Sequence, residues 1–180
     1  MIKTIKIKDS TFNLAATGRV LVEYKQQFGV DYFDDFLRIK AINTNISADE
    51  IQKAAITLEV GYRLIWSMAK AAAPDTIPDP DVWMDSFKDF PLVALLPQAM
   101  DLLGKAFEQA IADGSSGSGR LTSENLVACC LACGMSMDDI SNLSIGFLLN
   151  SISEYIKIKN GGKAPSGTKR KATQADFDAF

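Results

Sequence analysis

The first fifteen residues alternate between polar and apolar side chains, which is the pattern of a half-buried β-strand. Ile5 and Ile7 are the apolar positions of the first run, and Phe12 and Leu14 are those of the second. Residues 8–10, Lys-Asp-Ser, are turn-forming types and separate the two runs. The pattern therefore predicts a small N-terminal β-hairpin.

From residue 18 onward the apolar positions recur every three or four residues, which is the period of an amphipathic α-helix. Thr17 is expected to cap the first helix, and Gly29 to end it. A capping box at residues 47–50, Ser-Ala-Asp-Glu, predicts the start of a long central helix. Pro97 predicts a kink in the last helix, or separation of its first turn. The expected helices cover residues 18–28, 32–41, 47–73, a short stretch through 82–87, and 91–112.

Residues 113–120 read Asp-Gly-Ser-Ser-Gly-Ser-Gly-Arg and interrupt the helical pattern. Because such small polar residues neither sustain a helix nor pack a core, we expect a flexible tether between two separately folded parts. Three further helices are expected beyond it, over residues 122–133, 136–143 and 145–159. The Gly-, Lys- and Pro-containing remainder has no period and is expected to be disordered, with one helical turn at its end.

Together these patterns predict a mainly α (α+β) fold, in which an N-terminal β-hairpin is followed by a helical domain. The predicted organisation is a hairpin plus helical domain over 1–112, a flexible linker over 113–120, a small three-helix module over 121–159, and a disordered tail over 160–180.

The charge is mild, with a formal net value of -3, and it is unevenly placed. Residues 41–113 are acidic, whereas both ends are slightly basic. Because phosphate backbones and anionic lipids require clustered Lys and Arg, the balance disfavours nucleic acid and membrane surfaces as partners. No apolar run approaches the roughly 20 residues that span a bilayer. The start of the chain also lacks the pattern of a signal peptide, so we expect a cytoplasmic protein.

The candidate catalytic and metal-binding groups are few. The chain has no histidine, which removes Ser-His and Cys-His nucleophile pairs. Cys129, Cys130 and Cys133 have no fourth soft ligand for zinc, so we interpret them as reduced core thiols. We therefore expect no catalytic residue, no cofactor and no metal.

Four aspartates punctuate the loop and short helix after Pro74, namely Asp75, Asp79, Asp81 and Asp85. Helix capping and solvation explain them better than calcium binding, because the glycine turn and distal glutamate of an EF-hand are missing. A small enzyme that uses carboxylates remains a third and weaker hypothesis.

The aromatic residues Trp83, Phe87 and Phe90 follow the aspartate-rich loop closely. Aromatic residues at helical spacing are mostly core. These three nevertheless lie beside a loop, and we expect them to form an exposed apolar patch for a partner.

Residues 123–150 have the spacing of a helix-turn-helix, with Gly134 in the turn and Ile140 facing inward. A recognition helix must approach phosphates, but here its start carries Asp138 and Asp139 with no nearby Arg or Lys. A helical DNA-binding or regulatory adaptor that uses residues 121–158 is therefore the alternative function.

Three features together resemble a known family. They are the hairpin leading into residues 17–24 (Thr-Gly-Arg-Val-Leu-Val-Glu-Tyr), the helical body, and the ending at residues 170–180 (Arg-Lys-Ala-Thr-Gln-Ala-Asp-Phe-Asp-Ala-Phe). The combination resembles the tail assembly chaperones of long-tailed, siphovirus-type bacteriophages and of prophages of Gram-positive bacteria. The segment 113–120 departs from the family's layout, and a natural insertion, a module boundary and an engineered linker all stay open as its origin.

The resemblance implies a non-enzymatic function in phage tail morphogenesis. Such a chaperone binds the tape measure protein in the host cytoplasm, keeps it soluble while the tail tube polymerises, and is absent from the finished virion. The family also implies a frameshifted longer form that recruits the tail tube protein, and homo-oligomers along the client. Phe177 and Phe180, with Trp83, Phe87 and Phe90, are the expected partner-binding residues.

Overall fold

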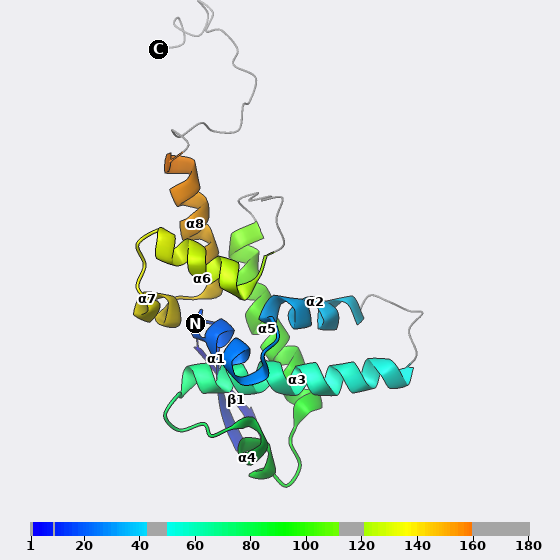
Figure 1. Ribbon diagram of the computed structural model, residues 1–180. Helices are drawn as coiled ribbons and strands as arrows, with labels where there is room; N and C mark the ends of the chain where they lie inside the picture. Colours follow the sequence, from blue (N-terminus) through cyan, green and yellow to red (C-terminus); the bar gives the residue numbers. More distant parts are fainter. Residues whose placement is uncertain (1, 9, 43–49, 112–120, 160–180) are drawn as a thin grey trace, which may run out of the picture.

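A computed structural model describes residues 2–8, 10–42, 50–111 and 121–159 of the chain (Figure 1). The fold is mainly helical with an N-terminal β-hairpin, as the sequence predicts. The elements are β1 (Ile2–Ile7), β2 (Ser10–Ala15), α1 (Arg19–Phe28), α2 (Tyr32–Ile42), α3 (Glu50–Ala72), α4 (Pro80–Asp85), α5 (Leu92–Ile111), α6 (Ser123–Ala132), α7 (Met137–Asn142) and α8 (Ile145–Lys159).

The two strands form an antiparallel hairpin whose register runs from Ile2 opposite Ala15 to Ile7 opposite Ser10. This register leaves two residues in the connection, and the first of them, Lys8, has a φ of 52°. A left-handed residue is what a two-residue hairpin connection requires, because its twist must match that of the strands. The predicted hairpin is therefore confirmed.

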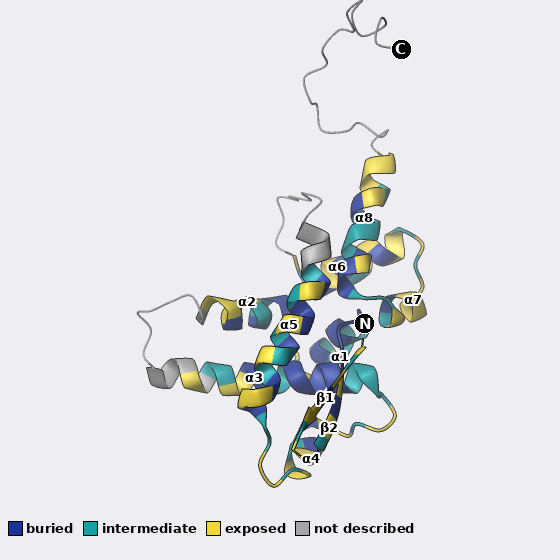
Figure 2. Cartoon of the chain, turned by 180° about the vertical axis from the view of Figure 1, so that it is seen from behind, coloured by how far each residue is buried: buried dark blue, intermediate teal, exposed yellow. Residues whose placement is uncertain are grey.

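Helix α3 crosses one face of the hairpin (Figures 1 and 2) and supplies a large part of the core. It packs against β2, α1, α2 and α5. Six of its apolar side chains are buried, namely Val60, Leu64, Ile65, Trp66, Met68 and Ala69. The indole N–H of Trp66 also donates to the carbonyl oxygen of Pro78 at 2.9 Å, which holds the loop that leads into α4. The predicted central helix is thus confirmed as the centre of the fold.

Helix α5 is continuous through Pro97, so the first turn is not split off. Its buried side chains are Leu92, Leu95, Ala99, Leu102, Leu103 and Ala106. The loss of the Pro97 backbone donor affects an exposed part of the helix, because Val93, four residues earlier, is 88% exposed and its carbonyl group can bond to water.

Helices α6 to α8 do not pack as a separate unit. Thr17 and Ser144 form an isolated antiparallel bridge. On either side of it, Gly18 N–H donates to Leu143 O at 3.0 Å and Ile145 N–H donates to Ala16 O at 3.2 Å. The buried side chains of these helices, Leu126, Cys130, Ile140, Ile145 and Leu148, belong to the same core cluster as those of α1, α3 and α5. The expectation of two separately packed parts is therefore corrected: residues 121–159 share one core with the body.

The predicted linker 113–120 and the predicted tail 160–180 lie outside the described residues, as do Ser47 to Asp49 of the expected capping box. Two other helices do start with a side-chain cap. Thr122 accepts from Asn125 N–H at the start of α6, and Ser136 and Asp139 form a reciprocal capping box at α7.

The expected cap at Thr17 is wrong. Gly18 occupies the N-cap position of α1, and no side chain bonds to that end of the helix. The reason is that the backbone of Thr17 is held in the bridge to Ser144. Its hydroxyl oxygen is buried and has no hydrogen-bond partner among the described residues.

Candidate partner-binding surface

The aromatic residues that the sequence singles out lie together against the hairpin. The ring centroid of Phe12 lies 6.4 Å from that of Trp83, 5.3 Å from that of Phe87 and 6.2 Å from that of Phe90. Only 6% of the Trp83 surface is exposed, and Phe87 and Phe90 are partly buried against the core. The expected exposed patch is therefore corrected to a mostly buried cluster, because strand β2 covers it with Phe12.

Phe177 and Phe180, the other two expected contact residues, lie outside the described residues. Their part in partner binding stays a prediction.

Residues 121–159 carry half of the large apolar side chains that are exposed in the described part of the chain. They are Leu121, Leu131, Met137, Phe147, Ile156 and Ile158. The other six are scattered from β1 to α5. Exposed apolar residues that are concentrated in one region mark an interaction surface more often than scattered ones do.

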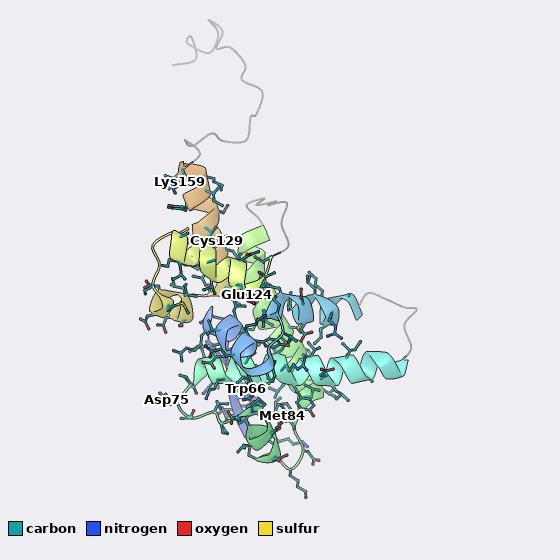
Figure 3. All side chains as sticks on the ribbon, viewed as in Figure 1. Trp66, Asp75, Met84, Glu124, Cys129 and Lys159 are labelled. Carbon is teal, nitrogen blue, oxygen red and sulfur yellow. The ribbon has the colours of Figure 1, made fainter. Side chains whose placement is uncertain are left out.

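Beyond its first turn, where the exposed Glu124 and Asn125 lie on the outer side, helix α6 is apolar on its outer side as well as on its inner side. Leu126 and Cys130 face the core, whereas Ala128, Cys129, Leu131 and Ala132 are exposed. At 100° per residue the four exposed positions form one continuous arc, which we call the outer face of α6. Figure 3 shows Cys129 on this helix, away from the body. A helix that is hydrophobic all round is normally buried, so the outer face is suited to cover by a partner.

Helix α8 extends the exposed apolar surface beyond the body. Its first residues, Ile145 and Leu148, are buried, while Ile156 and Ile158 near its end are 51% and 74% exposed. Figure 1 shows its last turns projecting past α6 and the end of α5. Because these last turns carry apolar side chains with little to pack against, they offer a second contact area for a partner.

A pair of polar contacts holds α6 so that its outer face points away from the body. Asp31 Oδ2 accepts from the backbone N–H of Ser123 at 2.8 Å, and Lys25 Nζ lies 2.7 Å from Glu124 Oε1. The hydrogen bond between Lys25 and Glu124 lowers the pKa of Glu124 and raises the pKa of Lys25. The Lys25–Glu124 ion pair is exposed, so it adds little to the stability of the protein directly, but it orients the first turn of α6.

A second polar cluster joins α1, α2 and α3 inside the protein. Asp35 is 3% exposed and accepts from the Tyr24 hydroxyl at 2.7 Å, from Arg38 at 2.9 Å and from Arg63 at 3.3 Å. Burial and then the hydrogen bond to Asp35 raise the pKa of Tyr24 far above its usual value. The buried carboxylate is fully paired, which is the condition under which a buried charge is tolerated. The cluster is structural, because all these groups are engaged with one another.

The three cysteines differ in exposure because they lie on different sides of α6 and at its end. Cys129 is exposed, Cys133 is partly buried and Cys130 is buried, and all three are free thiols. Burial, followed by the neighbouring Cys133 and Cys129, raises the pKa of Cys130 to about 11. Across the described ranges, no three acidic, cysteine or histidine side chains come together as a group that could hold a metal ion.

A hollow with a volume of about 620 Å³ is lined by Lys25, Val30, Asp31, Asp34, Asp35, Leu37 and Arg38. Its two cations already have partners, since Lys25 pairs with Glu124 and Arg38 pairs with Asp35. An anionic ligand would have to displace these carboxylates, so the hollow does not suit one.

The helix-turn-helix interpretation agrees with one feature of the structure, because Ile140 is fully buried. The exposed side of that region carries Glu124, Asp138 and Asp139. These charges would repel phosphate. The geometry therefore favours protein contact over contact with DNA.

The outer face of α6 is not identified from the sequence, although the sequence contains a signal for it. Residues 126–133 are apolar without interruption, so they lack the period that separates an inner face from an outer one. The interpretation of these cysteines as core thiols holds for Cys130 but not for Cys129.

Comparison of the chain with models of protein families, with curated protein sequences and with solved structures gives no match in any of the three. Among the described residues, every helix is too short or too polar to cross a membrane.

Proposed function

We propose that the protein is a non-enzymatic tail assembly chaperone of a long-tailed bacteriophage or prophage, which acts in the host cytoplasm on the tape measure protein. The hairpin, the helical body and the two sequence segments that resemble this family support the proposal. The observation that carries it is the exposed apolar surface of α6 and α8, with the outer face of α6 at its centre.

The chemistry of this surface fits a helical client. An amphipathic helix binds when its apolar stripe is laid on an apolar surface formed by helices. The exposed residues of α6 are small or medium in size, and α8 adds isoleucine side chains, so each contact with one copy is modest. A chaperone that must later release its client benefits from weak contacts, and many copies along one long client supply avidity.

The proposal is tested by producing the tape measure protein encoded beside the chain with and without it, and by measuring the soluble fraction and co-elution. The expected result is a client that is soluble only in the presence of the chain. A tape measure protein that is equally soluble alone would overturn the chaperone function.

The surface is tested by a pair of variants with a matched control. Leu131→Ser with Ile158→Ser removes exposed apolar groups from α6 and α8, where these side chains are 46% and 74% exposed. Leu58→Ser with Val93→Ser removes similar groups, 49% and 88% exposed, from α3 and α5. We expect the first pair to lose the client and the second pair to keep it. Equal retention by both pairs would show that the client binds elsewhere.

A further inference from the structure

The region around α4 has an acidic surface. Its five carboxylates, Asp75, Asp79, Asp81, Asp85 and Asp89, are all exposed, and none forms an ion pair with a described residue. Lys88 is the one basic residue between positions 75 and 90. Apolar groups lie among these charges, since Val82 is 62% exposed and Phe87 and Phe90 are partly exposed. We call these eight acidic and apolar residues the α4 face.

The end of the chain has the complementary composition. Residues 160–180 carry four basic residues, Lys163, Lys169, Arg170 and Lys171, and two acidic ones, Asp176 and Asp178. Two aromatic residues, Phe177 and Phe180, follow the basic ones, and the two aspartates lie on either side of Phe177. The basic residues between positions 163 and 171 complement the five aspartates of the α4 face, and the two aromatic residues complement its exposed Val82 and the partly exposed Phe87 and Phe90.

Lys159, the residue before this segment, does not lie near the α4 face of its own chain (Figures 1 and 3). Figures 1 and 2 show α8 and α4 at opposite ends of the molecule, and Figure 3 places Lys159 at one end and Asp75 and Met84 toward the other. Residues 160–180 can extend about 70 Å when fully stretched, at about 3.3 Å per residue. Because the end of α8 projects away from α4 (Figure 1), the α4 face of a second molecule can approach this end directly.

We propose that residues 160–180 of one copy dock on the α4 face of a second copy. Each copy then offers one basic segment and one acidic face. The contact is head-to-tail, and such a contact generates an open chain of subunits unless its rotation closes a ring. The α4 face is distinct from the outer face of α6, so this association goes beyond the proposed function and is measurable without any client.

The association is tested on the full chain by sedimentation velocity over a range of protein concentrations. We expect growth beyond the monomer with concentration, and an association constant that falls at least about tenfold between about 50 mM and about 500 mM salt, because exposed charges are screened. A chain that stays monomeric at low salt overturns the proposal. This includes a monomer in which the segment folds back on its own α4 face.

Two double variants that change the net charge by the same amount test whether the α4 face is the surface that accepts the segment. Asp85→Asn with Asp89→Asn removes two negative charges from the end of α4, and Gln26→Lys with Gln27→Lys makes the same change in net charge on exposed positions of α1. We expect the first pair to weaken association about tenfold and the second pair to leave it unchanged. An equal effect of both pairs would show that only net charge matters and would overturn the assignment of the face.

A charge exchange tests the pairing directly. Arg170→Glu with Lys171→Glu in one chain, and Asp85→Lys with Asp89→Lys in another, should each abolish self-association, because like charges then meet. An equimolar mixture should assemble again, since acidic segments now meet basic faces and basic segments meet acidic faces. Failure of the mixture to assemble, with both chains folded by circular dichroism, overturns the pairing.

Discussion

The carboxylate of Asp31 contacts the starts of two helices that are far apart in the sequence. Its Oδ1 accepts from the backbone N–H of Phe33 at 2.9 Å in the first turn of α2, and its Oδ2 accepts from Ser123 N–H at 2.8 Å at the first residue of α6. Both are N–H groups that a helix leaves without a partner of its own. One buried side chain thus fixes α6 relative to the body.

Replacement of Asp31 by alanine should lower the free energy of unfolding by about 2–3 kcal/mol, because a cap is lost and Ser123 N–H is left without its acceptor. Asp31→Asn should cost less, since the amide oxygen still accepts one hydrogen bond. Denaturant unfolding measures both variants. Asp75→Ala, at an exposed position, is the control and should change stability little. An Asp31→Ala variant as stable as this control would show that the contact contributes nothing.

Gly18 marks the closest approach between α1 and the α7–α8 segment. A Cβ atom at this position would collide with the carbonyl oxygen of Ile140 and would lie 2.8 Å from Leu148. Because a backbone oxygen cannot move aside cheaply, Gly18→Ala should destabilise the protein by about 1–3 kcal/mol. Gly104→Ala is the matched control, since a Cβ there meets nothing within 4 Å, and it should stabilise α5 by up to about 1 kcal/mol. Thermal unfolding that gives the same sign for both variants would contradict this account of the contact.

Local signals explain why most elements could be predicted from the sequence. Gly29 ends α1 with a φ of 69°, a conformation that glycine adopts without strain. Ser136 and Asp139 form their capping box within four residues. Each such signal lies within about one helical turn of the boundary that it sets, so the sequence alone reveals it.

The way in which the elements face one another could not be predicted in the same manner. Thr17 has the right chemistry for a cap, but its backbone is taken by Ser144 from the far end of the chain. Trp83 follows a loop, and only the fold shows that Phe12 covers it. The outer face of α6, in turn, comes from a stretch that is apolar throughout, so no period separates its exposed side from its buried side.

Two buried tyrosines make stability sensitive to alkaline pH. Burial raises the pKa of both Tyr24 and Tyr32 well above the usual value of 10, and for Tyr24 the bond to Asp35 adds to this effect. The contribution of the two tyrosines to the free energy of unfolding is complete below pH 10. It is lost as the pH rises further, because they ionise in the unfolded state while they stay protonated in the folded one. The unfolding equilibrium constant should therefore rise by up to about tenfold per pH unit for each of them.

The check for this prediction is the phenolate absorbance of the protein, recorded with far-ultraviolet circular dichroism during an alkaline titration. The absorbance of Tyr24 and Tyr32 should appear only together with the loss of helical signal. The variant Tyr24→Phe shows how much of the absorbance change comes from Tyr24. Ionisation of both residues in a fully helical protein would contradict their burial.

The exposed thiol of Cys129 reports directly on the outer face of α6. In the free protein it should react with maleimide first and Cys130 last, because Cys130 is buried and burial raises its pKa to about 11. If the tape measure protein covers this face, the complex should label Cys129 at least about tenfold more slowly, since the thiolate must reach the reagent to react. Peptide mapping by mass spectrometry resolves the sites without removing any cysteine.

Leu58→Cys, half-exposed on α3, is the control and should label at the same rate in the free protein and in the complex. Undiminished labelling of Cys129 in a complex that co-elutes intact would move the client to another surface while leaving the chaperone function standing.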